Sequence, residues 1–102
     1  MKSPQDCQNI EDIREAIDNL DRDIIDKFSQ RFVYVKAAAK FKKNPQEVKA
    51  KERFKLMLRQ RRDWAKERNL NPDVIENIYR DLVNYFIHEE LQSWQQEKPP
   101  QQ

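Results

Sequence analysis

Apolar residues recur at intervals of three and four positions along most of the chain, which places them on one face of an α-helix. The first such stripe begins after Asn9 and runs to about Phe41. Asn9 is a suitable N-cap, since its side chain can accept a hydrogen bond from the first turn. About thirty residues form roughly 45 Å of helix, which is too long to fold back on one small globule. We therefore expect a long first helix that needs a partner. Its apolar stripe consists of Ile13, Ile17, Leu20, Ile24, Phe28, Phe32, Val35 and Ala38.

Two more helices are predicted after this one. The segment from Lys42 to Lys49 contains an Asn-Pro pair and is predicted to be a mobile loop. The second helix is expected from about Ala50 to Arg68, and the third begins at Asn71-Pro72. Proline suits the first helical position, because its missing N–H would have no partner there. The third helix is expected to end before Lys98, and β-alternation is absent, so the predicted class is all-α.

Composition adds an argument for a dimer. The chain has 102 residues, of which 37% are apolar. It is expected to form one domain over residues 1–98, followed by a disordered tail over 99–102. A chain this short and polar builds only a thin core by itself, which favours a homodimer. The sequence contains no glycine, which excludes a P-loop and a dinucleotide-binding fingerprint.

Charge and chemistry exclude further classes. There are 20 basic and 18 acidic residues, a balance that favours neither nucleic acid nor an anionic membrane as partner. The basic segment from Lys49 to Arg68 also carries interleaved acids, so we interpret it as a solvated helix face. Cys7 and His88 are single residues of their kinds, and a metal site needs more ligands. We expect no metal and no cofactor. No stretch resembles a signal peptide or a membrane span, so we expect a cytoplasmic protein.

One acidic residue stands where the pattern requires an apolar one. Val83, Ile87, Glu90 and Trp94 follow helical spacing, so Glu90 is predicted to lie in an apolar slot. A carboxylate buried there is costly unless it is paired or protonated.

Cations recur along the predicted first helix and the loop after it. Arg31 lies beside the apolar stripe, Lys42 follows about three turns later, and Arg14 points about a quarter-turn away. Taken singly, each such cation is typical of a solvated side chain. Residue patterns alone therefore indicate a helical domain without naming its function.

Several stretches resemble the all-helical class of chorismate mutases, and especially its isochorismate pyruvate lyase branch, which makes salicylate for siderophores. The similarity covers nearly the whole chain. The similar segments are Asp6-Cys7, Asp12 to Asp18, Tyr34 to Ala38, Phe41-Lys42, Glu52-Arg53, Trp64-Ala65, Asn69-Leu70 and the residues Ile87, Glu89 and Trp94. The resemblance implies an intertwined homodimer of three-helix subunits, in which the long first helices span both subunits.

The resemblance also implies site residues. Arg31, Lys42 and Arg53 would line one site, and Arg14 would enter from the other subunit. The two arginines Arg14 and Arg31 would hold the substrate carboxylates, because a guanidinium can bind both oxygens. Lys42 would face the ether oxygen, and Arg53 would complete the cationic wall. A pericyclic reaction has no obligatory nucleophile, metal or proton transfer, so the protein must supply a compact substrate conformer and complementary charge.

Two positions separate the lyase from the mutase. The mutases of this class resemble one another in carrying acids three residues before and one residue after the arginine of the second helix. Ala50 and Phe54 occupy those positions here and resemble the lyase branch. The leading interpretation is an isochorismate pyruvate lyase with weak chorismate mutase activity. The alternatives are a dedicated chorismate mutase, a non-catalytic helical dimerisation module, and a nucleic-acid binder that uses Lys49 to Arg68.

Glu90 is the main departure from the family pattern. The lyases and many bacterial mutases carry glutamine there, whose amide can donate to the ether oxygen. An ionised carboxylate has no proton to donate. We hypothesise that Glu90 acts as a neutral acid, as glutamate is implied to do in some fungal mutases.

Overall fold

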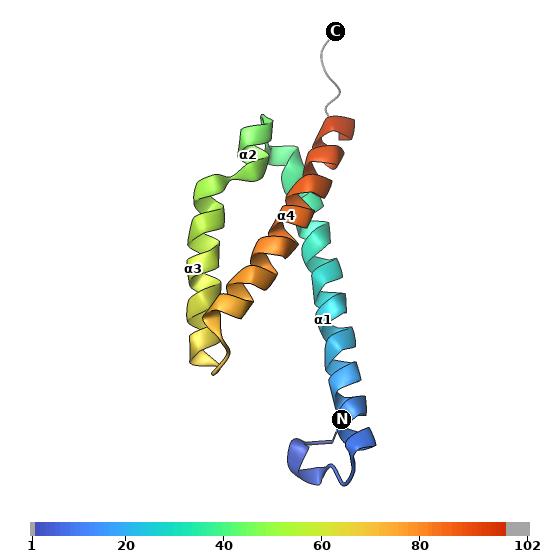
Figure 1. Cartoon of the computed structure of the whole chain (residues 1–102). Coiled ribbons are helices and arrows are strands. Elements are labelled where there is room, and N and C mark those ends of the chain that lie inside the picture. Colours follow the sequence, from blue (N-terminus) through green and yellow to red (C-terminus); the bar gives the residue numbers. More distant parts are fainter. Residues whose placement is uncertain (1, 98–102) are drawn as a thin grey trace. The chain divides into compact units, whose positions relative to one another are not determined.

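The computed structural model describes residues 2–97, and within them every regular element is a helix (Figure 1). The contacts divide the chain into two compact units, Met1–Tyr34 and Val35–Gln102. In chain order the elements are η1 (Pro4–Asp6), α1 (Ile10–Ala38), η2 (Ala39–Phe41), α2 (Pro45–Lys49), α3 (Lys51–Glu67) and α4 (Pro72–Glu97). The all-α class is confirmed. The predicted tail, residues 99–102, lies outside the described residues.

The first unit contains η1 and most of α1. As predicted, Asn9 caps α1: its Oδ1 accepts a hydrogen bond from the Asp12 N–H at 2.8 Å. The Asp12 carboxylate in turn accepts from the Gln8 N–H at 3.0 Å and from the Lys2 ammonium at 3.1 Å. These contacts tie the N-terminal lead-in to the first turn of α1 and hold the pKa of Asp12 below its usual value, the Gln8 hydrogen bond contributing most.

The apolar stripe of helix α1 is partly exposed along its length. Its 29 residues correspond to about 44 Å of helix, and no side chain between Ile10 and Ala38 is buried. Ile17, Leu20 and Ile24 are each 48–49% exposed. Isolated exposed apolar residues are common, but a stripe along one helix face is not.

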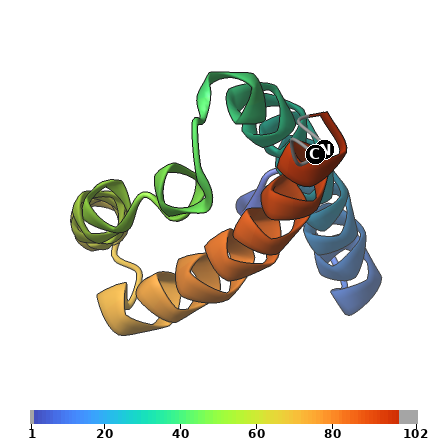
Figure 2. The ribbon, with the colours of Figure 1, turned by 90° about the horizontal axis from the view of Figure 1, so that it is seen from above.

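The second unit is organised around the packing of α3 against α4. The core cluster consists of Met57 and Leu58 from α3 and Val83 from α4, with Phe54, Tyr79 and Ile87 packed against it. In Figures 1 and 2 the two helices meet at the turn between them and diverge towards α2. Val83 and Ile87 belong to the apolar stripe that helical spacing predicted for α4.

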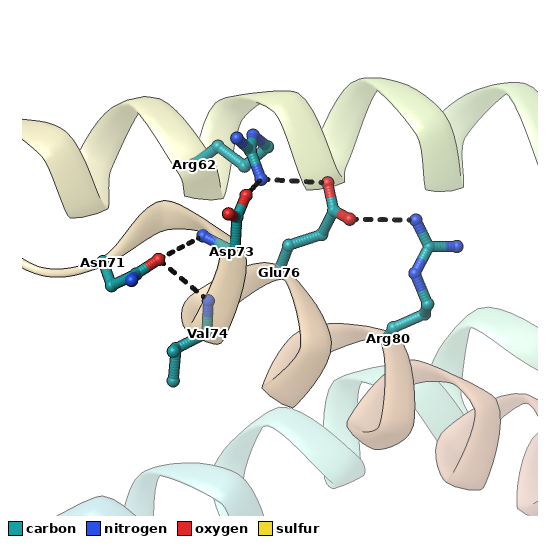
Figure 3. Close-up of polar contacts among 6 residues, drawn as sticks. All are labelled: Arg62, Asn71, Asp73, Val74, Glu76 and Arg80. Carbon is teal, nitrogen blue, oxygen red and sulfur yellow. Dashed lines mark hydrogen bonds and ion pairs between the residues drawn. The ribbon is translucent and has the colours of Figure 1, made fainter.

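The turn from α3 to α4 closes with two recognisable motifs. Asn69 adopts a left-handed conformation with φ of 60°. The Leu70 N–H donates to the Ala65 carbonyl at 2.9 Å and the Asn69 N–H to the Lys66 carbonyl at 3.2 Å, the Schellman pattern of a helix C-terminus. Asn71 then caps α4, because its Oδ1 accepts from the backbone N–H of Asp73 at 2.9 Å (Figure 3).

A chain of ion pairs joins α3 to α4 beside this turn (Figure 3). Arg62 contacts Asp73 at 2.7 Å and Glu76 at 3.5 Å, and Glu76 also contacts Arg80 at 3.2 Å. Because Asp73 and Arg80 are largely exposed, each pair contributes only about 0–1 kcal/mol. The network therefore contributes little to the free energy of unfolding compared with the apolar core of the two helices.

The structure differs from the predicted elements in the segment after α1. Residues 42–49 were expected to form a loop, but Pro45–Lys49 form the short helix α2. Asn44 provides the reason, since its side chain accepts a hydrogen bond from the Glu47 N–H at 2.9 Å and caps this helix. Within residues 2–97, none of the helices combines the length and the apolar character that crossing a membrane requires.

Replacing the cap of α4 should lower the stability of the chain. The Asn71→Ala variant loses the side-chain acceptor for the first turn of α4, and we expect a loss of about 1 kcal/mol in the free energy of unfolding. Urea denaturation followed by circular dichroism measures this. Asn84→Ala, an exposed change on the same helix, is the matched control, and equal stability losses in the two variants would contradict the capping role.

Candidate functional site

Lys42 stands at the end of η2, with its side chain turned back along the segment that follows. Its backbone is extended, with φ of −91° and ψ of 136°. Its Nζ donates to the Glu47 carbonyl oxygen at 3.0 Å in a partly buried contact. The ammonium is thus held close to α2 and does not project freely into solvent.

The segment from Lys42 to Ala50 is a small folded unit with internal hydrogen bonds. Asn44 caps α2, and the Glu47 side chain accepts from the Lys43 N–H. Val48 is 3% exposed and anchors α2 in the apolar interior. Ala50 joins α2 to α3 in the left-handed region, with φ of 43°, an uncommon conformation for a residue with a Cβ.

An open hollow of about 940 Å³ lies between this segment and the start of α3. Its cationic lining residues are Lys42, Lys49, Lys51 and Arg53. Glu47 and Glu52 also line it, so the cations exceed the acids by two. The structure therefore brings the predicted residues Lys42 and Arg53 to one concave surface whose charge suits an anionic ligand.

Glu90 occupies the buried position on α4 that its periodicity predicted. It is 6% exposed, and its Oε1 has no hydrogen-bond partner among residues 2–97. Burial raises the pKa of Glu90 above its usual value, while the positive charge of Lys42 lowers it by a smaller amount. Burial therefore makes Glu90 easier to protonate than an exposed glutamate, and the nearby Lys42 offsets part of this effect.

Trp94 connects the same face of α4 to Lys42. Its Nε1–H donates to the Lys42 carbonyl oxygen at 2.9 Å, a contact across 52 positions of sequence. Trp94 follows Glu90 by four residues, which places both side chains on one side of α4. The same face of α4 therefore presents both Glu90 and Trp94 to Lys42.

Arg14 and Arg31 both lie on α1, within the first unit. Arg14 is exposed and Arg31 is partly exposed. They are 17 residues apart on one continuous helix, so their Cα atoms are separated by roughly 25 Å along its axis. This separation is far larger than a small dicarboxylate, so the two arginines of one chain cannot hold the same small molecule.

Ala50 and Phe54, the two apolar positions that the family resemblance singled out, lie in different surroundings. Phe54 packs against the α3–α4 core, and the Arg80 guanidinium lies 5.9 Å from the centre of its ring. Ala50 lines the hollow at the junction of α2 and α3. Neither position offers a carboxylate to a hydroxyl group in the hollow.

Comparison with known proteins relates these features to a family. The sequence pattern of the family described as chorismate mutase type II matches residues 13–91, which include all five predicted site residues. The chain belongs to this family. It is also 40% identical, over 96 residues, to the isochorismate pyruvate lyase of Pseudomonas aeruginosa (strain PAO1). That match covers 94% of this chain and 95% of the relative.

In this chorismate mutase type II family member, two contacts of Lys42 could not be predicted from the sequence. In the first, the Lys42 ammonium donates a hydrogen bond to the Glu47 carbonyl. In the second, the Trp94 indole donates a hydrogen bond to the Lys42 carbonyl. Every residue has a backbone carbonyl, so nothing in the sequence indicated which one would accept the first hydrogen bond. The second had a partial signal, because Trp94 shares the helical stripe of Glu90.

Replacing Glu90 should change how stability depends on pH. Because the pKa of Glu90 is raised in the folded state, the folded protein binds more protons than the unfolded chain, and stability falls as the pH rises from the unfolded pKa through the folded one. Glu90→Gln removes this dependence. We expect it to raise the free energy of unfolding by about 1 kcal/mol at neutral pH and by less in acid.

Urea titrations of both proteins across roughly pH 4 to 8 measure this difference. Glu89→Gln is the matched control, since it removes a charge from the neighbouring position outside the buried slot. A stability difference between wild type and Glu90→Gln that stays constant with pH would contradict the raised pKa.

Proposed function

We propose that this chain is an isochorismate pyruvate lyase that forms salicylate and pyruvate, with weak chorismate mutase activity. The observation that carries the proposal is the 40% identity, over nearly the full length of both chains, to an isochorismate pyruvate lyase. The cationic hollow beside Lys42 and Arg53 supports it, because the substrate is a dianion.

The reaction needs little covalent chemistry from the protein. A ring hydrogen of isochorismate moves to the methylene carbon of the enolpyruvyl group while the ether carbon–oxygen bond breaks, so the atoms and electrons balance within the substrate. The ether oxygen becomes the keto oxygen of pyruvate, and the ring becomes aromatic. Catalysis then consists of holding a compact conformer and stabilising the negative charge that develops at the ether oxygen.

The proposed residue roles follow from charge and position. Arg14 and Arg31 bind the two carboxylates, and Arg53 completes the cationic wall. Lys42 exchanges the Glu47 carbonyl for the ether oxygen when substrate binds, and the hydrogen bond from the ammonium strengthens as negative charge develops on that oxygen in the transition state. Glu90, in its protonated form, donates a second hydrogen bond to that oxygen, which its buried position and raised pKa favour.

The apolar residues Ala50 and Phe54 favour lyase over mutase as the main activity. The hydroxyl group of chorismate would need a polar partner in the site, and these positions provide none. The core contacts of Phe54 leave no room for an acid there without the cost of burying a charge.

We further propose an intertwined homodimer in which each site takes Arg14 from one subunit and Arg31, Lys42 and Arg53 from the other. Two observations support it. The arginines of a single α1 are roughly 25 Å apart, so a site that uses both needs two copies of the helix. The stripe of half-exposed apolar residues on α1 is also typical of a surface that a second subunit covers. A single domain over residues 1–98, a role in siderophore synthesis and a cytoplasmic location remain predictions from the sequence.

The direct test is to incubate the purified protein with isochorismate and with chorismate separately. We expect salicylate, detected by its fluorescence, well above the uncatalysed rate, and slow prephenate formation from chorismate. Activity should rise as the pH falls below neutral, since the protonated fraction of Glu90 increases, and Glu90→Gln should flatten this rise. Loss of chorismate without salicylate formation would indicate a dedicated mutase, and no turnover of either compound would favour a non-catalytic dimer.

Subunit mixing tests the shared site. Arg14→Ala and Lys42→Ala should each be nearly inactive alone. In a hybrid dimer one site contains both lesions and the other contains neither. After unfolding and refolding together in equal amounts, half of the dimers are hybrids with one intact site of two, so about a quarter of wild-type activity should return.

The matched control for this experiment is the pair Lys42→Ala and Arg53→Ala. Both residues come from the same subunit in the proposed site, so no hybrid contains an intact site and activity should stay low. Recovery in the control pair, or none in the first pair, would contradict the proposed division of residues between subunits.

A further inference from the structure

The indole of Trp94 contacts the segment that carries Lys42 through that residue's backbone, and it does so from the helix that also carries Glu90. We propose that Trp94 is a positioning residue that fixes the direction of the Lys42 side chain. The proposal rests on the role proposed above for Lys42. It adds a residue that touches neither substrate nor reacting atoms.

The backbone of Lys42 links the position of its carbonyl to the direction of its side chain. The backbone is extended, and the Lys42 carbonyl accepts a hydrogen bond from Trp94 at 2.9 Å, which holds that carbonyl against α4. The Lys42 N–H donates to the Ala39 carbonyl at 3.2 Å, so both backbone polar groups of the residue are engaged. The peptide plane on either side of Lys42 therefore has little freedom to rotate.

Several polar contacts of the following segment lie within it. Asn44 and Glu47 bond within residues 43–47, and the Lys42 ammonium itself bonds to the Glu47 carbonyl. These bonds shape α2 without fixing its position on α4. Apolar burial of Val48 and Ala39 holds the segment in place, but burial has no directional preference. The Trp94 hydrogen bond, which is directional, fixes the orientation of the Lys42 backbone relative to α4.

The orientation of Lys42 also affects Glu90. Its charge state is coupled to Lys42, so the distance between the two side chains bears on the pKa of Glu90. Because Trp94 and Glu90 are four residues apart on one helix, the indole sets where the lysine stands relative to the acid. Loss of the Trp94 donor should therefore weaken catalysis and change its pH dependence together.

The experiment replaces the donor atom alone. In a Trp64→Phe background, Trp94 is the single tryptophan of the chain and can be substituted biosynthetically. The isostere β-(3-benzothienyl)alanine keeps the bicyclic ring but has sulfur in place of N–H. The control analogue, 5-fluorotryptophan, keeps the N–H. Trp64 lies on α3 beside Arg61 and eleven residues after Arg53, roughly 16 Å along the helix axis, so the background protein should retain wild-type turnover.

We expect the sulfur isostere to lower kcat for isochorismate about 3- to 10-fold, the rate equivalent of one neutral hydrogen bond, with little change in KM. The 5-fluorotryptophan protein should retain background activity. The pH at which activity rises should also shift in the isostere, because Glu90 responds to Lys42. In a Lys42→Met background the isostere should cause no further loss, since its effect acts through Lys42.

A second readout does not depend on activity. Hydrogen exchange followed by mass spectrometry should show faster exchange across residues 42–50 in the isostere, with the α3–α4 core unchanged. If the unsubstituted protein fails to turn over isochorismate, the proposed function is wrong, while the exchange still decides whether Trp94 anchors the segment. The positioning role would be overturned if the isostere changed neither the hydrogen exchange nor kcat. It would also be overturned if the isostere lowered kcat by the same factor in the Lys42→Met background as in the protein that retains Lys42.

Discussion

The packing of α3 against α4 is the interaction on which the second unit depends. Met57 and Leu58 meet Val83 in a small core, and the Schellman turn and the Asn71 cap hold the two helices at one end. At the other end the helices diverge, and α2 lies there (Figure 1). The hollow lined by Lys42 and Arg53 lies between the segment that contains α2 and the start of α3. A core this small leaves that end open, which is what an anionic substrate of modest size requires.

The buried Glu90 is the clearest conflict between stability and function in the chain. Glutamine would fill the same space without an ionisable group, and desolvation makes the carboxylate unfavourable when charged. The nearby Lys42 offsets part of that cost but not all of it. The same burial favours the neutral form of the acid, and in the proposed role a neutral carboxyl group donates a hydrogen bond to the ether oxygen. Such conflicts are expected at functional sites.

The long α1 presents the opposite situation, because it is regular, well capped and without a buried residue between Ile10 and Ala38. Its apolar stripe is evident from the sequence, and Ile17, Leu20 and Ile24 within it are about half exposed. A second copy would cover the stripe and would also bring Arg14 near the remaining cations. Dimerisation would then serve stability and catalysis through the same helix.

Helical periodicity and local capping signals were enough to predict the three long helices, the cap at Asn9 and the buried place of Glu90, because each depends on neighbours within a few turns. The short helix α2 was missed, because the Asn-Pro pair before it was interpreted as part of a loop. The resemblance of the residues to a known family indicated the reaction. The contacts of Lys42 were beyond this reasoning. Its carbonyl meets an indole 52 positions away, and its ammonium meets a backbone oxygen, an acceptor that every residue possesses. The sequence thus determined which residues form each helix face, since spacing along a helix is a local property. Only the tertiary structure decided which groups meet Lys42, because that depends on how separate segments pack in space.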